Sequence, residues 1–231
     1  MSAPPPAPPG AGTGPGGASD AAPAPVWAVV VAAGGGTRFG GPKQYAPLGD
    51  RRVVDWSLGA ARAATDGVVL VVPPDRAATA EPGADVVVAG GATRSASVRA
   101  GLAAVPAEAE VVVVHDGARP LAGPSLYGAV VAAVRDGADA AVPGVALVDS
   151  VRRRDGGAVD RDELVAVQTP QAFAAAALRA AHASGGEASD DATLVERAGG
   201  KVVVVPGDPA NLKVTHPADV DVAARHLGLV P

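Results

Sequence analysis

The sequence contains no cysteine, and only 3% of its 231 residues are aromatic. The absence of cysteine excludes a disulfide framework, a Cys-ligated metal or iron–sulfur site, and a cysteine nucleophile. Basic residues are too few for a general nucleic-acid binder, because 19 Lys and Arg stand against 24 Asp and Glu, a net charge of −5. With so few aromatic residues, the core must consist of Val, Leu and Ala, and valine favours buried parallel strands.

Long hydrophobic runs are missing as well. The apolar segments extend over about eight residues at most, whereas a helix that spans a bilayer needs about 20. No basic region precedes the first apolar run, so the sequence predicts no signal peptide. We therefore expect a cytoplasmic protein without a membrane partner.

The N-terminal segment differs in composition from the rest of the chain. Residues 1–25 consist almost entirely of Pro, Gly and Ala, with little apolar surface to bury. Such a segment cannot offset the entropy that it would lose on ordering, so we predict a disordered tail over 1–25. We expect a single domain over residues 26–231.

Short valine-rich runs alternate with amphipathic stretches throughout this domain. Runs with little polar alternation are typical of strands that are covered on both faces. The alternation predicts an α/β fold, Rossmann-like, with a mostly parallel central sheet flanked by helices. Ligands bind such sheets at the carboxyl ends of the strands. The expected strands are 26–33, 68–72, 85–89, 111–115, 139–145 and 201–205, and the expected helices are 53–64, 74–80, 94–104, 123–136, 172–183, 189–198 and 216–227.

Residues 147–161 interrupt the alternation. Two short runs surround Asp155-Gly156-Gly157, and Asp-Gly is a strong turn signal. The segment predicts a β-hairpin arm that projects from the domain, with a mobile surface loop as the alternative. Because an isolated two-stranded hairpin is only marginally stable in water, we expect the arm to pack against something, for example a second subunit.

The first expected strand ends in a glycine-rich segment, AAGGGTRFGGPKQY, at 32–45. Glycines let the backbone approach a ligand closely and leave N–H groups to point at phosphate oxygens. Arg38 and Lys43 add two cations, so the segment predicts a polyphosphate cradle. It is not a Walker A loop, because Pro42 occupies the lysine position, and Phe39 occupies the last small-residue position of a dinucleotide fingerprint.

Charged side chains also follow later expected strands. Asp116 could hold Mg²⁺, which prefers a few carboxylates together with substrate phosphates. Arg119 could clamp a phosphate through two hydrogen bonds. Lys213 could meet a second phosphate, although a solvated lysine remains the alternative, and His115 is predicted to be structural. Two phosphorylated ligands that meet over Mg²⁺ indicate a nucleotidyl transfer.

Six segments, in their order along the chain, resemble the 2-C-methyl-D-erythritol 4-phosphate (MEP) cytidylyltransferases of the non-mevalonate isoprenoid pathway. They are AAGGGTRFGGPKQY, GGATRSASVRAGL, VVVHDGARP, VDSVRR, VQTPQAF and NLKVTHPADV, and the resemblance extends over residues 26–227. The resemblance implies the reaction of CTP with MEP to give CDP-methylerythritol and pyrophosphate, with Mg²⁺. It also implies a nucleotidyltransferase fold and a homodimer in which the arm crosses to the partner subunit.

The resemblance further implies roles for individual residues. Arg38 and Lys43 match transition-state stabilisers, and Arg161 and Lys213 match residues that position MEP. The positions that match CTP contacts are Ala32, Ala33, Gly34, Gly36, Gly91 and Ser97. The positions that match substrate contacts are Asp116, Arg119, Ser150 and Thr169, with Asp116 also near the metal. Ser150 stands where the family usually has threonine, and both Ser150 and Arg161 would act on the partner's site.

Two other functions remain open from the sequence. A ribitol 5-phosphate cytidylyltransferase has similar motifs, and the extra methyl group of MEP gives only about 1–3 kcal/mol of discrimination in a pocket. From a different class, the chain could be a catalytically inactive nucleotide-binding subunit. The presence of Arg38, Lys43, Asp116 and Lys213 argues against an inactive chain.

Overall fold

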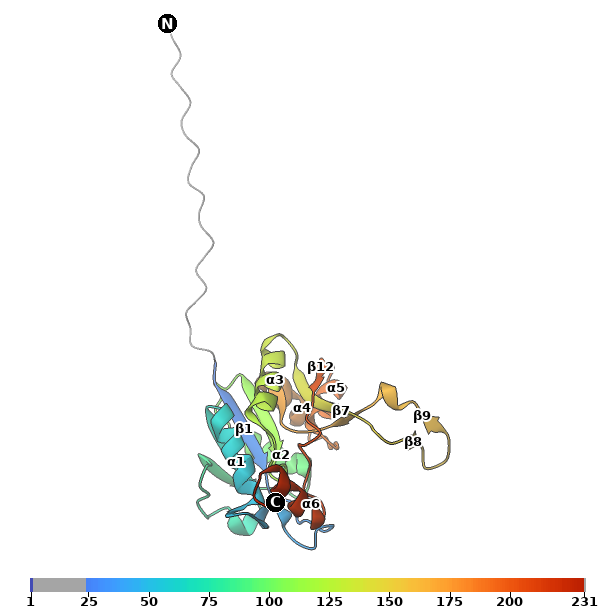
Figure 1. Cartoon of the computed structure of the whole chain (residues 1–231). Helices are drawn as coiled ribbons and strands as arrows, with labels where there is room; N and C mark the ends of the chain where they lie inside the picture. Colours follow the sequence, from blue (N-terminus) through green and yellow to red (C-terminus); the bar gives the residue numbers. More distant parts are fainter. Residues whose placement is uncertain (2–23, 231) are drawn as a thin grey trace.

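The computed structural model describes Met1 and residues 24–230, so nearly all of the predicted tail lies outside the described residues. Within them, the centre of the molecule is an eight-stranded sheet of order β10-β7-β11-β6-β1-β4-β5, in which β12 also pairs with β7. Helices cover both faces of this sheet (Figure 1). The strands are β1 (Val26–Val31), β4 (Gly67–Val72), β5 (Val86–Ala89), β6 (Val111–Asp116), β7 (Ala140–Ala146), β10 (Val165–Val167), β11 (Gln171–Ala174) and β12 (Val202–Pro206).

Alternate residues of the central strand β1 serve two separate cores. Ala28 and Val30 pack with helices α1 and α3 on one face, whereas Val29 packs with α2, α4 and α5 on the other. Every one of these three side chains is fully buried, as the valine-rich runs predicted. Helix α6 packs on a third, smaller cluster beside Leu48 and Val214. The helices are α1 (Val53–Ala64), α2 (Arg94–Ala103), α3 (Pro124–Arg135), α4 (Ala175–Ala183), α5 (Asp191–Arg197) and α6 (Ala218–His226).

The α/β prediction with a mostly parallel sheet is confirmed. Strand β1 is parallel to both β4 and β6, β5 is parallel to β4, and β12 is parallel to β7. Strands β10 and β11 are antiparallel to their neighbours. Because Val31 pairs with Asp116 in this register, the segments that follow β1 and β6 leave the sheet side by side.

Two of the expected helices are wrong in extent. The segment expected as helix 74–80 forms only the short 3-10 helix η2 (Pro74–Arg76), which begins at the second of two consecutive prolines. The helix expected from residue 172 begins at Ala175, because Ala172 and Phe173 belong to β11 and are buried between β6 and β7. The sequence did not predict this strand because the segment is rich in alanine, which favours helices but also fits buried positions in a sheet.

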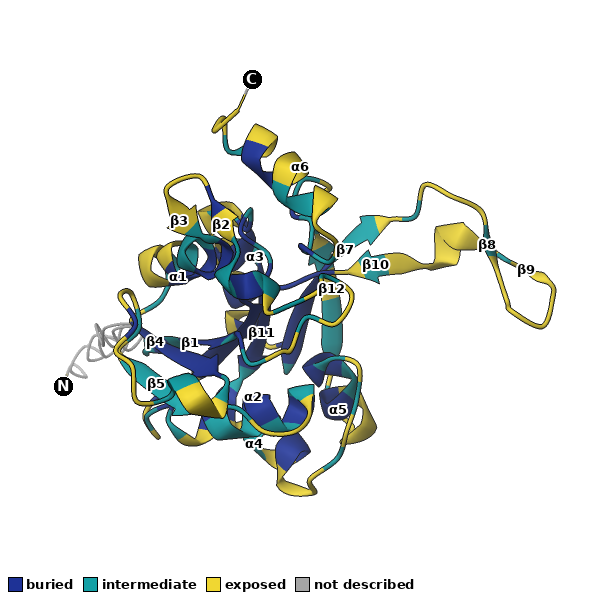
Figure 2. Ribbon diagram, turned by 90° about the horizontal axis from the view of Figure 1, so that it is seen from below, coloured by how far each residue is buried: buried dark blue, intermediate teal, exposed yellow. Residues whose placement is uncertain are grey.

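The arm is a hairpin, as predicted. Strands β8 (Val151–Arg152) and β9 (Ala158–Val159) pair antiparallel, and the turn between them uses positive φ angles at Gly156 and Gly157. The arm extends away from the body of the molecule (Figure 2). Among the described helices, none has the length and apolar character needed to cross a membrane.

Helix α2 lies so close to the sheet that Gly101 has no room for a side chain. A Cβ at Gly101 would lie 2.5 Å from Val29 and 2.8 Å from Val71, whereas a Cβ at Gly128 of α3 meets nothing within 4 Å. We predict that Gly101→Ala destabilises the protein by about 1–3 kcal/mol through overpacking. Gly128→Ala, the matched control, should stabilise it by up to about 1 kcal/mol through helix propensity.

The comparison is made by urea unfolding of both variants and the original chain. Equal stabilities for the two alanine variants would show that α2 can move away from the sheet at little cost.

Candidate active site

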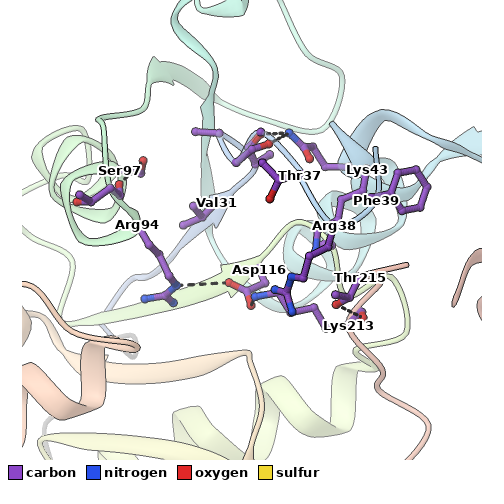
Figure 3. Close-up of a pocket in the computed structure, with 18 of the residues that line it drawn as sticks. Val31, Thr37, Arg38, Phe39, Lys43, Arg94, Ser97, Asp116, Lys213 and Thr215 are labelled. Carbon is purple, nitrogen blue, oxygen red and sulfur yellow. Dashed lines mark hydrogen bonds and ion pairs between the residues drawn. The ribbon is translucent and has the colours of Figure 1, made fainter. Parts of the chain in front are cut away.

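A pocket of about 360 Å³ opens where β1 and β6 end, beside the start of α2 (Figure 3). This is the carboxyl edge of the parallel strands, where ligands bind such sheets. The residues that line it are Val31, Ala32, Ala33, Gly34, Gly35, Gly36, Thr37, Arg38, Phe39, Lys43, Gln44, Gly91, Ala92, Thr93, Arg94, Ser97, Asp116, Ala118, Lys213 and Thr215.

The glycine-rich loop after β1 turns tightly around Gly36. The Gly36 carbonyl accepts hydrogen bonds from the amides of Phe39, Gly40 and Gly41 at 2.9–3.2 Å. Gly36 has a φ of +66°, and a Cβ there would lie 1.8 Å from the Gly41 oxygen, so only glycine fits. The backbone amides of residues 33–38 donate no hydrogen bond to any described residue. They are therefore available to an anionic ligand in the pocket.

Gln44 fixes this loop to the segment that carries Lys43. Its buried side chain donates to the carbonyls of Ala32 at 2.7 Å and Gly34 at 3.0 Å. Lys43 and Gln44 belong to the 3-10 helix η1 (Lys43–Tyr45), and the guanidinium of Arg76 stacks 4.0 Å from the Tyr45 ring. The contacts of Gln44 and Tyr45 thus hold the short helix, and its first residue, Lys43, lines the pocket.

Lys43 lies in a partly buried and positively charged environment. Burial lowers the pKa of its ammonium group, and the neighbouring charges of Lys213 and Arg38 lower it further. A bound anion would relieve this repulsion. The arrangement therefore favours a polyphosphate over a neutral ligand.

The start of α2 forms a second wall. Its N-cap, Thr93, accepts a hydrogen bond from the Ala96 amide, and Ser97 Oγ accepts one from the Gly91 amide at 3.1 Å. A Cβ at Gly91 would lie 2.5 Å from Ala96, so this turn also requires glycine. The N-terminus of a helix carries partial positive charge, which suits an anionic ligand.

Asp116 is the one acidic side chain among the described residues that line the pocket. Its carboxylate lies 2.7 Å from Lys213 Nζ, 3.6 Å from Arg94 Nε and 3.9 Å from Arg119 Nε. Burial opposes the charged form, but these three cations hold the pKa of Asp116 well below its usual range. The pocket therefore contains a permanent negative charge surrounded by cations (Figure 3).

Lys213 reaches Asp116 because the segment after β12 docks on the segment after β6. The Val214 amide donates to the Ala118 carbonyl at 2.8 Å, and Arg119 Nη1 donates to the Asn211 carbonyl at 2.8 Å. The Asn211 side chain, fully buried, donates to the Thr169 carbonyl at 2.9 Å. This gives the single asparagine of the chain a structural role.

A buried network behind Asp116 fixes the tautomer of His115. His115 Nε2 must donate to the Arg119 carbonyl, 3.2 Å away, because a carbonyl only accepts. His115 Nδ1 then accepts from Thr169 Oγ1 at 3.2 Å, and Thr169 Oγ1 accepts from the Asp116 amide at 3.0 Å. Complete burial lowers the pKa of His115 to about 4. His115 is a neutral support for Asp116, which agrees with its predicted structural role.

The structure brings most of the predicted site residues into one pocket. Those that line it are Ala32, Ala33, Gly34, Gly36, Arg38, Lys43, Gly91, Ser97, Asp116 and Lys213. Arg119 and Thr169 are largely buried behind the pocket and do not line it. Ser150 and Arg161 line a separate hollow on the arm that shares no residue with the pocket.

Sequence reasoning missed Arg94, which lines the pocket and faces Asp116. The position of Arg94 in the sequence could have indicated this role. Arg94 is the first residue of a helix, directly after the N-cap Thr93 and close to the end of a strand. Asp190 is the N-cap of α5, and its side chain accepts a hydrogen bond from the Thr193 amide. Asp191 instead forms an ion pair with Arg94 at 2.7 Å.

Unpaired amides, several cations and one carboxylate at the carboxyl edge of a parallel sheet define a nucleotide-binding α/β protein, of the kind suited to nucleotidyl transfer. The model of the 2-C-methyl-D-erythritol 4-phosphate cytidylyltransferase (IspD) family matches residues 26–228. The chain belongs to this family, and the predicted resemblance is confirmed.

Individual relatives agree with the family model. A 2-C-methyl-D-erythritol 4-phosphate cytidylyltransferase of Cereibacter sphaeroides is 45% identical over 218 residues, which cover 87% of this chain and 96% of the relative. The crystal structure of the protein of that name from Thermus thermophilus superposes with a TM-score of 0.73 at 38% identity, covering 87% of this chain and 98% of that one.

A bifunctional enzyme IspD/IspF of Dinoroseobacter shibae is 44% identical over 215 residues, covering 87% of this chain and 54% of the relative. The chain thus spans about half the length of the bifunctional curated relatives that it matches.

The buried His115 gives the protein a specific acid sensitivity. Because its pKa falls from 6.5 to about 4 on folding, the unfolded chain binds the extra proton between these values. The stability from neutral His115 is therefore complete above pH 6.5 and is lost as the pH falls toward 4. We predict that urea midpoints decline less steeply over this range in His115→Gln than in the original chain. Parallel declines would contradict a buried neutral histidine.

Proposed function

We propose that this chain transfers CMP from CTP to MEP, giving CDP-methylerythritol and pyrophosphate. The observation that carries the proposal is the lining of the pocket, which combines residues 33–38, whose amides donate to no described residue, with the cations of Arg38, Lys43 and Lys213. The family model and the names of the relatives support MEP over ribitol 5-phosphate as the acceptor.

The chemistry requires no base on the protein. A phosphate oxygen of MEP attacks the α-phosphorus of CTP in line, a new P–O bond forms, and the bond from the α-phosphorus to the bridging oxygen breaks to release pyrophosphate. Because a phosphate is already ionised, the protein contributes positioning and charge stabilisation. Arg38 and Lys43 stabilise the negative charge that develops on the leaving pyrophosphate, and Lys213 attracts the phosphate of MEP.

The site fits Mg²⁺ that binds together with the phosphates of the nucleotide. The described residues contain no group of three or more His, Cys, Asp or Glu that could hold a metal by themselves. One carboxylate together with substrate phosphates is a usual environment for Mg²⁺, and Asp116 offers that carboxylate. When bound, the ion would neutralise phosphate charge and polarise the phosphoryl group.

The arm supports a homodimer in which each arm reaches the other subunit's pocket. Arg161 and Ser150 line a hollow that shares no residue with the pocket. The arm that carries this hollow extends away from the body of the chain (Figure 2). Apolar side chains at its base are exposed, with Val148 at 85%, Val165 at 43% and Val204 at 55%. A second copy that covered this base would bury them and steady the hairpin.

The first test measures pyrophosphate release from CTP and Mg²⁺ with MEP, with ribitol 5-phosphate, or without an acceptor. We expect release with MEP, and a loss of about 10²-fold or more in kcat for Lys43→Ala, because a charge-stabilising donor is removed. Lys201→Ala, at an exposed lysine outside the pocket, is the matched control.

Release with ribitol 5-phosphate alone would reassign the acceptor. CTP binding without release would favour an inactive nucleotide-binding subunit. A Lys43→Ala variant within a few-fold of the original chain would contradict the role of that lysine.

The second test mixes the Arg161→Ala and Lys43→Ala variants, each of which we expect to have low activity by itself. If arms cross, every mixed dimer has one pocket with intact Lys43 that receives an intact Arg161. Random exchange should then restore about a quarter of the original activity, since half the dimers are mixed and half their sites are intact. Subunits mixed without exchange are the control. No recovery in dimers shown to be mixed by native mass spectrometry would place Arg161 in its own chain's site.

A further inference from the structure

A buried carboxylate lies directly behind the pocket wall. Asp191, the first residue of α5, is fully buried and does not line the pocket. The N-terminus of α5 does not need it, because Asp190 already accepts the capping hydrogen bond from the Thr193 amide at 3.1 Å. A buried carboxylate is costly unless it is paired, so the partners of Asp191 indicate what it does.

Asp191 is paired on both of its oxygens. Oδ2 accepts a hydrogen bond from Arg94 Nη1 at 2.7 Å, and Oδ1 lies 3.0 Å from His182 Nε2. His182 is itself buried, on α4. The carboxylate is therefore fixed from two sides, and its position cannot change without breaking one of these contacts.

Arg94 connects this carboxylate to the pocket. Its guanidinium binds Asp191 through Nη1, while Nε faces Asp116 Oδ1 at 3.6 Å. The two carboxylates thus hold one planar guanidinium between them, and Figure 3 shows Arg94 directed from α2 toward Asp116, with Lys213 on the other side. A fork of fixed donors suits this bridge, whereas the single ammonium of a lysine would not span it.

We propose that Asp191 is a positioning residue of the nucleotide site, which holds Arg94 against Asp116 and so offsets the one negative charge in the pocket. The inference rests on the proposed function in that the ligand is CTP. Asp116 would otherwise repel a polyphosphate, and a cation fixed beside it reduces that repulsion more than a cation that swings in solvent. Asp191 acts through Arg94, without contact to the ligand.

A positioning role for Asp191 and a simple charge effect predict opposite changes in CTP affinity for the Asp191→Asn variant. Asp191→Asn makes the protein less acidic, so long-range electrostatics alone would strengthen the binding of CTP. Positioning predicts weaker binding, because Arg94 loses the charged partner that holds it in place. Asp190→Asn is the matched control, since it makes the same charge change on the neighbouring residue, which contacts Thr193 and Gln171 instead of Arg94.

The experiment measures Kd for CTP with Mg²⁺ by calorimetry, and kcat and KM for CTP, in the full chain and its variants. We expect Asp191→Asn and Arg94→Ala each to raise Kd about tenfold or more, the scale of a lost charge-assisted hydrogen bond. Asp190→Asn should stay within about twofold. The double variant Arg94→Ala/Asp191→Asn should equal Arg94→Ala alone, since Asp191 has nothing left to position.

Two results would overturn the inference: unchanged or tighter CTP binding in Asp191→Asn, or losses that multiply in the double variant. Melting temperatures identify variants that fail to fold. If Asp191→Asn is one of them, Arg94→Lys keeps the charge but cannot bridge both carboxylates, and CTP binding equal to that of the original chain overturns the inference.

The same measurements distinguish a failure of the proposed function from a failure of the role proposed for Asp191. An original chain that binds CTP but releases no pyrophosphate with any acceptor overturns the transfer reaction, while the pattern of Kd values still decides the role of Asp191. An original chain that does not bind CTP overturns both.

Discussion

The site depends on one ionised carboxylate that the fold keeps charged among cations. Asp116 ends the central strand β6, and its partners come from three separate segments: Arg94 from α2, Arg119 from the loop after β6, and Lys213 from the segment after β12. Attraction to these cations exceeds the cost of burying the carboxylate. The same attraction draws the three segments together, so the ion pairs that stabilise Asp116 also shape the pocket.

Around Asp116, the backbone contributes hydrogen-bond donors and the side chains contribute positive charge. A loop whose shape is set by the positive φ of Gly36 and by the side chain of Gln44 brings residues 33–38, with amides that donate to no described residue, to the pocket. Arg38, Lys43 and Lys213 add charge at its rim. Amides held by a rigid loop need little reorganisation when a phosphate arrives, and lysine and arginine supply the long-range attraction that amides lack.

Much of this could be predicted from the sequence. The valine-rich runs predicted the parallel strands, because a strand buried on both faces must be apolar throughout. The glycine-rich loop, Asp116 and Lys213 stood just after predicted strands, and the order of a parallel sheet brings such positions to one edge. The hairpin was visible from Asp155-Gly156-Gly157. These inferences succeed because they depend on neighbours in the chain.

The remainder depends on contacts between distant segments. β11 was hidden, because Ala172 and Phe173 become strand residues only when β6 and β7 lie on either side. Arg94 and Asp191 are 97 positions apart, and no local pattern shows that they pair. The sequence alone determined the parallel strands, the glycine-rich loop and the chemical types of the site residues, through local spacing and backbone preference. Only the tertiary structure decided which charges meet at Asp116, because α2 and the segments after β6 and β12 come together at one edge of the sheet.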